Sequence, residues 1–269
     1  FFEGTGGTGG VALANAGQLT LGGIGAVASI TATGAITIVT TSPLTVDINT
    51  TTAGTLTLTA GEIGDAGVFA DDLTINAGVT VRSTGADVAL NAGDDVILGG
   101  SVVALTTVTI RAGAGDLDAG GSVADANGAL VNVSAATLDV TAIGNDAVTA
   151  IDLDTTVTVI LNAAVTPGTG GIDLQDTAGG LTVTAASTVG GDVRIEAVGG
   201  DLTASAVTAG GAGSDATIVT TGAGNINVGL VIADGDVVTF DSAGNVTDTD
   251  GAGNDVTADA LVALTETGF

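Results

Sequence analysis

The amino-acid sequence predicts an all-β protein, a single parallel β-solenoid with about 20 residues per coil and roughly 13 coils. Three observations predict this fold. The first is a short phrase that recurs, in which an apolar–x–apolar strand, often with Thr at its centre, is followed by Ala-Gly. The second is that the strands are only three to five residues long. The third is that Gly, Asn and Asp fill the gaps between them. The phrase occupies residues 56–61, 73–78, 88–93 and 108–113.

The strands are expected wherever β-branched or other apolar residues alternate with polar ones, because this period of two suits a half-buried pleated strand. Gly, Asn and Asp between them supply the backbone conformations that sharp corners require. In chain order the expected strands are residues 19–21, 36–38, 44–46, 56–58, 73–75, 88–90, 96–98, 108–110, 131–133, 138–140, 151–153, 157–159, 172–174, 181–183, 193–195, 226–228 and 238–240.

The spacing of the strands favours a solenoid over an antiparallel sandwich. Strand starts lie 20 or 21 residues apart, as at 36 and 56, 88 and 108, 131 and 151, 172 and 193, and 226 and 246, with another strand between each pair. A sandwich does not require one corner phrase at a fixed period. We therefore expect one continuous domain over residues 1–269, as part of a longer chain or a stacked fibre. Only residues 255–264 have a helical stripe, and part of that segment fits a strand equally well.

Composition excludes several classes of partner. The chain has 30 acidic residues, three arginines and a net charge of −27, which repels phosphate backbones, so no nucleic-acid partner is expected. Apolar residues make up 45% of the chain, which argues against disorder. Residues 4–46 carry no charge, but they are rich in Gly and Thr and alternate like strands, so no membrane insertion is expected. The chain has no cysteine and hence no disulfide or thiolate site.

Residues 87–100, with the sequence DVALNAGDDVILGG, resemble the filamentous-haemagglutinin-like repeats of giant bacterial exoproteins. That resemblance implies a right-handed β-helix that serves as the non-enzymatic shaft of a bacterial fibre or adhesin. It implies an extracellular location, either secreted or on the cell surface. The expected partners are further copies or a continuation of the same chain, stacked end to end, and a host or neighbouring-cell surface.

Calcium is the one ligand that the sequence suggests, although the shaft itself requires no cofactor. Residues 210–218 match the G-G-x-G-x-D-x-U-x calcium nonapeptide except that Thr217 replaces its large apolar residue, and residues 250–255 match it in part. The candidate ligands are Asp215, Asp250, Asn254 and Asp255. Because oxygen ligands suit Ca²⁺, the alternative function is a Ca²⁺-dependent surface-layer or repeat-in-toxin-like exoprotein segment.

Two further classes remain as minor alternatives. A polysaccharide-acting β-helix enzyme would need converging acid–base groups, and the candidates are the pairs Asp71/Asp72 and Asp94/Asp95 and the Arg194 side chain beside Asp192. The chain has no His, Lys, Tyr or Trp to assist them. An ice-binding solenoid would need Thr-x-Thr elements aligned on one flat face, but Asp, Asn or Arg often takes the central outward position.

Overall fold

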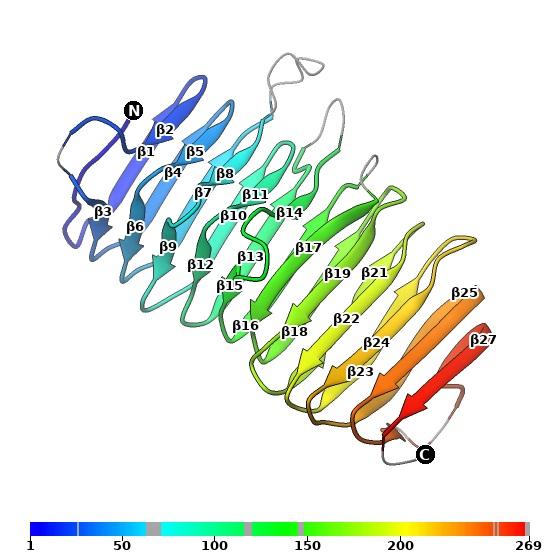
Figure 1. Ribbon diagram of the computed structural model, residues 1–269. Helices are drawn as coiled ribbons and strands as arrows, with labels where there is room; N and C mark the ends of the chain where they lie inside the picture. The colour runs from blue at the N-terminus through cyan, green and yellow to red at the C-terminus, as the bar shows by residue number, and fades with distance from the viewer. Residues whose placement is uncertain are drawn as a thin grey trace. The chain divides into compact units, whose positions relative to one another are not determined.

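The computed structural model describes residues 1–25, 27–62, 71–115, 120–144, 148–249, 251 and 253–266. These residues form an all-β fold and contain no helix; the fold is a parallel β-solenoid of about 10 turns with ~23 residues per turn (Figure 1). Contacts between Cα atoms divide the chain into two compact units, Phe1–Ala136 and Thr137–Phe269. Each unit is described separately below.

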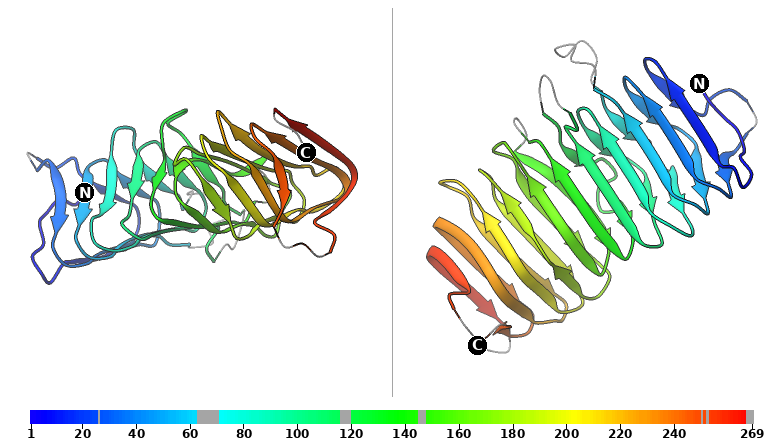
Figure 2. Two further views of the ribbon diagram at one scale, coloured as in Figure 1. Left: turned by 90° about the horizontal axis from the view of Figure 1, so that it is seen from below. Right: turned by 180° about the vertical axis from the view of Figure 1, so that it is seen from behind.

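The first unit is a stack of coils with three strands per coil (Figure 2). Strands at the same position in successive coils pair in parallel, and each such set forms one face. Face A contains β1 (Val11–Asn15), β4 (Ile36–Thr40), β7 (Leu56–Ala60), β10 (Val88–Ala92) and β13 (Thr107–Ala112). Face B contains β2 (Leu19–Leu21), β5 (Leu44–Val46), β8 (Leu73–Ile75), β11 (Val96–Leu98) and β14 (Val123–Asp125). Face C contains β3 (Ser29–Ala32), β6 (Asn49–Thr52), β9 (Thr80–Ser83), β12 (Ser101–Val103) and β15 (Val133–Ser134).

Side chains of like kind stack directly above one another inside the first unit. On face A the fully buried residues Ile36, Leu56, Val88 and Val108 pair in register, while Thr37 and Thr57 occupy the outward positions. Alternation of buried and outward positions thus repeats in each coil, which keeps the aliphatic side chains in continuous columns. Burial of these columns is the main stabilising contribution.

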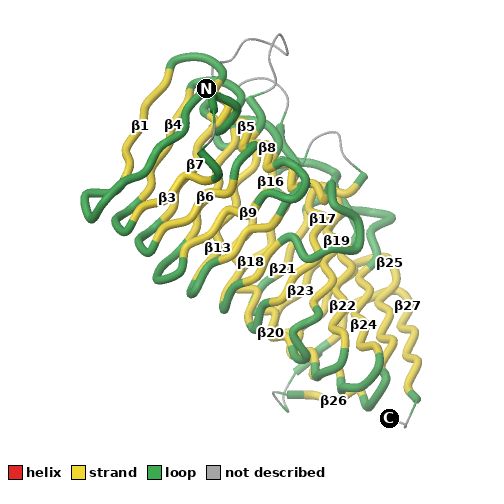
Figure 3. Tube along the Cα trace, turned by 60° about the vertical axis from the view of Figure 1, so that its left-hand side comes forward, coloured by secondary structure: helices red, strands yellow, loops and turns green. Residues whose placement is uncertain are grey.

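The second unit also has three faces, but several of its strands run through corners (Figure 3). Face P contains β17 (Thr149–Thr156), β19 (Gly171–Asp176), β22 (Val193–Val198), β24 (Ala216–Thr221) and the C-terminal parts of β25 (Ile226–Ser242) and β27 (Val256–Thr265). Face Q contains β20 (Leu181–Val183), β26 (Val246–Asp248) and the N-terminal parts of β18 (Val159–Val165), β23 (Leu202–Ala209) and β25. Face R contains β21 (Ala186–Thr188), the remaining parts of β18, β23, β25 and β27, and most of β16 (Thr137–Ala142). The first two residues of β16 pair with the face Q part of β18.

Buried hydroxyl groups stabilise the glycine corners of both units. Ser83 Oγ donates a hydrogen bond to the carbonyl of Gly54 at 2.7 Å, and Thr220 Oγ1 donates one to the carbonyl of Gly224 at 3.0 Å. Both hydroxyls lie at the last inward position of a strand. A corner carbonyl that faces the core would otherwise lose its hydrogen bond to water, so these hydroxyls replace that bond.

The predicted parallel β-solenoid is confirmed, but its coil count differs somewhat from the prediction: the fold has about 10 turns of ~23 residues, where roughly 13 coils of about 20 residues were expected. The spacing of 20 between Ile36 and Leu56 is a true coil, because the two residues pair. Leu56, however, pairs next with Val88, 32 positions on, whereas Leu73 lies on face B and pairs with Leu44. The coils therefore differ in length, while the strands keep their pairing register.

Two predicted strands were wrong in position, and one ambiguity is resolved. Residues 131–132 lie outside a strand, since β15 begins at Val133 and the Asn132 side chain is buried and donates to the carbonyl of Leu98. Residues 157–158 form the corner between β17 and β18. Of the two alternatives for residues 255–264, the strand is observed, as β27.

Candidate functional site

Aspartate and asparagine side chains at the corners of the second unit bind the main chain of the next coil. Each accepts a hydrogen bond from a backbone N–H about one coil further on. The pairs are Asp192 Oδ1 with Asp215 N (2.9 Å), Asp215 Oδ1 with Val237 N (3.0 Å), Asp201 Oδ1 with Asn225 N (2.7 Å) and Asn225 Oδ1 with Asn245 N (2.9 Å). These carboxylates and amides therefore join successive coils, in addition to the strand pairing.

The first unit uses the same type of contact. The pairs are Asn49 Oδ1 with Thr80 N (2.8 Å), Asp72 Oδ1 with Asp95 N (3.1 Å), Asp87 Oδ1 with Thr107 N (3.0 Å) and Asp95 Oδ1 with Ser122 N (2.6 Å). Some of the acidic residues thus have a structural role, because they supply acceptors to corner amides that lie outside the strand ladder.

The candidate catalytic pairs Asp71/Asp72 and Asp94/Asp95 lie together at one corner. The N–H of Asp71 donates to Asp94 Oδ2 at 2.7 Å, and Asp72 accepts from Asp95 as described above. The pKa of Asp72 is raised, mainly because its side chain is buried. The hydrogen bond from Asp95 N lowers this pKa, but the neighbouring charges of Asp95, Asp94 and Asp71 raise it further. Within the described ranges, no three His, Cys, Asp or Glu side chains are grouped so that they could hold a metal ion.

The predicted calcium ligands lie at different corners. Asp215 directly precedes β24 on face P and uses Oδ1 to accept from Val237 N. Asp255 directly precedes β27, and its main-chain carbonyl accepts from Val231 N at 2.8 Å. Asn254 is exposed beside it, and Asp250 lies outside the described residues. The described members therefore form two separate groups, Asp215 alone and Asn254 with Asp255.

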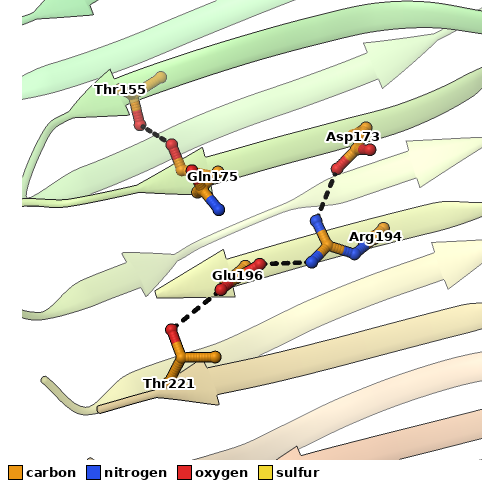
Figure 4. A network of polar contacts seen from close by, with 6 residues as sticks. All are labelled: Thr155, Asp173, Gln175, Arg194, Glu196 and Thr221. Atoms are coloured by element: carbon orange, nitrogen blue, oxygen red, sulfur yellow. Dashed lines mark hydrogen bonds and ion pairs between the residues drawn. The ribbon is translucent and has the colours of Figure 1, made fainter. Parts of the chain in front are cut away.

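A network of outward-facing polar side chains joins three neighbouring strands of face P, β19, β22 and β24 (Figure 4). Arg194 of β22 binds Asp173 of β19 through Nη1 at 3.0 Å, and its Nη2 binds Glu196 on its own strand. Thr221 Oγ1 of β24 donates to Glu196 Oε1 at 2.9 Å. The partners of Arg194 are thus Asp173 and Glu196 rather than Asp192, its neighbour in the sequence.

Glu196 is the least accessible member of this network, with its side chain 10% exposed. Burial raises its pKa, but hydrogen bonds from Arg194, Thr221 and Gln175 and the charge of Arg194 outweigh burial, and the pKa is lowered. Burial lowers the pKa of Arg194, yet its contacts with Glu196 and Asp173 leave that pKa raised. Both side chains therefore stay charged at neutral pH, and the network is an ion-pair bridge between coils.

Replacement of Arg194 by Leu is expected to destabilise the second unit by about 1–3 kcal/mol, toward the lower end because the Arg194 side chain is 40% exposed to water. The reason is that Glu196 would keep its buried charge without a counter-ion. The double variant Arg194→Leu/Glu196→Leu should recover most of the loss. Chemical unfolding of the three chains measures this, and a double variant that is no more stable than Arg194→Leu contradicts the bridge.

Asp176 is a carboxylate on the inward side of face P, and it is 1% exposed. Its Oδ1 accepts from Val157 N at 2.7 Å and Thr155 Oγ1 at 3.0 Å, and its Oδ2 accepts from Ala178 N at 2.9 Å. Burial raises the pKa of Asp176 more than these hydrogen bonds lower it. The side chain organises the corner after β17 and the turn after β19.

The raised pKa of Asp176 predicts that mild acid stabilises the second unit. A group with a raised pKa in the folded state binds its proton more tightly there than in the unfolded chain, so stability falls as pH rises through the folded-state pKa. We expect the melting temperature to rise as pH is lowered from neutral toward the ordinary pKa of Asp. Asp176→Asn should flatten this dependence, as measured by calorimetry over pH, and an unchanged slope would show that Asp176 is not responsible.

The two groups that sequence reasoning missed are Asp176 and Glu196. A signal for Asp176 was available, because its position continues the inward series Ile172 and Leu174 of β19. No such signal marked Glu196, which occupies an ordinary outward position and is covered by neighbours from other coils.

No protein-family model, curated protein sequence or solved structure matches this chain. The class of protein is therefore defined by the fold alone, as a parallel β-solenoid. Among the described residues, no helix has the length and apolar character needed to cross a bilayer.

Proposed function

We propose that this chain is a non-enzymatic structural shaft of a secreted or cell-surface bacterial fibre or adhesin. The observation that carries the proposal is the in-register stacking of aliphatic columns within each unit, as in Ile172–Val193–Ala216–Val238 of the second. Each coil contacts mainly its neighbours in the stack, so further coils add length without requiring a new core. The resemblance of residues 87–100 to exoprotein repeats supports the extracellular location.

The proposed partners of the shaft are further coils, from the same polypeptide or from a second copy, and a host or neighbouring-cell surface. Leu261 of β27 supports the first of these. It pairs with the fully buried Val238 and continues that inward column, yet it is 54% exposed. A further parallel coil on β27 would bury Leu261 and pair the outer edge of the strand.

Negative-stain electron microscopy of the native material, with and without millimolar Ca²⁺, tests this function. The proposal predicts long, thin, unbranched fibres in both conditions. Compact, separate particles in both conditions would contradict it and favour a discrete binding module.

A Ca²⁺-dependent exoprotein segment is the second candidate function, and one corner of the second unit favours it. Asp192, Asp215 and Asp236 lie on three successive coils there, and Asp236 Oδ2 accepts from Gly213 N at 2.6 Å. Each carboxylate uses one oxygen for a main-chain N–H, and the three do not form one group that could hold a metal ion among the described residues, so a hard cation would bind there to single carboxylates through the other oxygen. If EDTA leaves the β circular dichroism and the melting temperature unchanged, this candidate fails.

A further inference from the structure

Strand β27 is the last strand of the second unit, and one of its edges has no partner strand among the described residues. Its inward positions continue the buried columns of β25 but are partly open to water, with Leu261 54% exposed. A cavity of about 150 Å³ lies at this uncovered end of the core, and its lining includes the inward apolar residues Val228, Phe240, Val246, Val256 and Leu261. An unpaired strand edge beside uncovered apolar side chains favours the addition of a further coil.

Strand β1 forms the corresponding open edge of the first unit, because β4 is its one partner strand among the described residues. Val11 and Leu13 pair with fully buried residues of β4 and so occupy inward positions, yet both are only half-buried. Phe2 belongs to the same end, on face B, where it forms a parallel bridge with the buried Leu21 and is itself half-buried. The first unit thus leaves inward apolar side chains uncovered at its first coil, as the second unit does at its last.

The order of the faces along the chain fits these two ends together. In the second unit the chain passes from face P to face Q and then to face R, so a coil that follows β27 would begin on face Q. The first unit begins on face B with Phe2, continues on face C with Thr5, and reaches face A with β1. Docking in this order places face B on face Q, face C on face R, and β1 on the face P part of β27. Phe2 then lies over β26, beside the cavity at the end of the core.

The inward residues of the two edges also match in kind. Along each strand, two apolar inward residues are followed by a polar one, and all of them pair with buried residues of the neighbouring coil. Parallel pairing of β1 with β27 therefore continues three inward columns, with Val11 on Leu261, Leu13 on Ala263 and Asn15 on Thr265. This is the same kind of in-register stacking that holds the coils together inside each unit.

The charges of the two ends favour contact between unlike ends. Residues 4–46 carry no charged side chain, and the carboxylate of Glu3 accepts a hydrogen bond from Ile24 N at 2.8 Å within its own unit. At the other end, Asp259 and Glu266 are exposed. Contact between two C-terminal ends would bring these carboxylates together, whereas the first coil offers them an uncharged surface.

We propose that the β27 edge binds the β1 edge of a second copy of this chain, so that copies join head to tail in the register given above. This inference rests on the proposed shaft function and names the surfaces through which the shaft grows. Because the two surfaces differ, a pair of copies keeps one free edge of each kind, and further copies extend the pair into a filament.

Cysteine cross-linking tests the register, because the chain has no cysteine of its own. In the proposed register Ala12 pairs with Val262, both at outward positions, and Cα atoms on neighbouring strands are about 4.8 Å apart, which is within the range for a disulfide. A mixture of Ala12→Cys and Val262→Cys chains should form a disulfide-linked dimer under mild oxidation. The matched control is a mixture of Ala12→Cys and Thr257→Cys chains, which should not, since Thr257 is exposed on the face R part of β27. Preferential dimers of Val262→Cys with itself would show that like ends meet, and would overturn the proposal.

Sedimentation velocity of the cysteine-free chain measures the assembly itself, and we expect a sedimentation coefficient that rises with protein concentration. Leu261→Asp should weaken this self-association by about tenfold or more, because it places a charge in a column that docking buries. Thr239→Asp adds the same charge at an outward position of β25, one coil from the edge, and should leave the association within about twofold. A chain that stays monomeric and gives no cross-link overturns the inference. Fibres in the native material would then leave the shaft proposal standing, with the further coils supplied by the same polypeptide, whereas their absence would overturn both.

Discussion

Gly191→Ala is expected to destabilise the second unit by about 3 kcal/mol or more, the upper range for overpacking of a tight interior. The added Cβ would lie 2.4 Å from the Gly170 carbonyl oxygen and 2.7 Å from Gly171 N, both of them backbone atoms of the preceding coil. Backbone cannot rotate away as a side chain can, so the two coils must separate. Thermal unfolding followed by circular dichroism, with hydrogen exchange of the β22 amides, measures the effect.

The adjacent Gly190→Ala is the matched control, because its nearest contact would be an ordinary 3.5 Å and no left-handed backbone is involved. It should be neutral or slightly stabilising, since Ala reduces the conformational freedom of the unfolded chain. Equal melting temperatures for the two variants would mean that the coils do not stack as closely as described.

Phe240→Ala is expected to cost about 3–5 kcal/mol, the range for truncation of a buried aromatic side chain. Phe240 is the largest fully buried side chain among the described residues. In its inward column it pairs with Ile218 of β24 on one side and with Ala263 of β27 on the other. Its loss would leave a cavity that the stacked coils on either side cannot close without breaking their register.

Thr239→Ala is the control for this prediction, because Thr239 is the outward neighbour of Phe240 on β25. It should change stability by less than about 0.5 kcal/mol, as expected for a surface position. Chemical unfolding compares the two variants. A similar loss of stability in both would contradict the inward and outward assignment on this face.

The sequence was sufficient to predict the parallel solenoid, because inward aliphatic residues and corner glycines both follow from local patterning. It was not sufficient to predict the face that each strand occupies. The phrases at Leu56 and Leu73 are nearly identical, yet they lie on different faces, and only the pairing of Leu56 with Val88 distinguishes them. Face C was missed in large part because polar residues such as Thr50 point inward there and obscure the alternation.

The corner carboxylates illustrate the same limit. Asp215 and the glycines before it match a calcium nonapeptide in the sequence, but in the structure the Asp215 carboxylate accepts a hydrogen bond from the N–H of Val237, 22 positions away. A capping carboxylate and a metal-binding carboxylate have the same local sequence. Only the stacking of the coils determines which backbone groups lie within reach.

The central claim of this account is that successive coils pair in parallel in the observed register, and spin labelling tests it most directly. The chain has no cysteine, so two labels can be introduced at Thr57 and Ala89, which occupy outward positions on paired strands. Neighbouring strands are about 4.8 Å apart, so this pair should show strong dipolar broadening in electron paramagnetic resonance. Labels at Thr57 and Thr74, on different faces, should show less. Stronger broadening for Thr57 with Thr74 would contradict the register and with it the stack of coils.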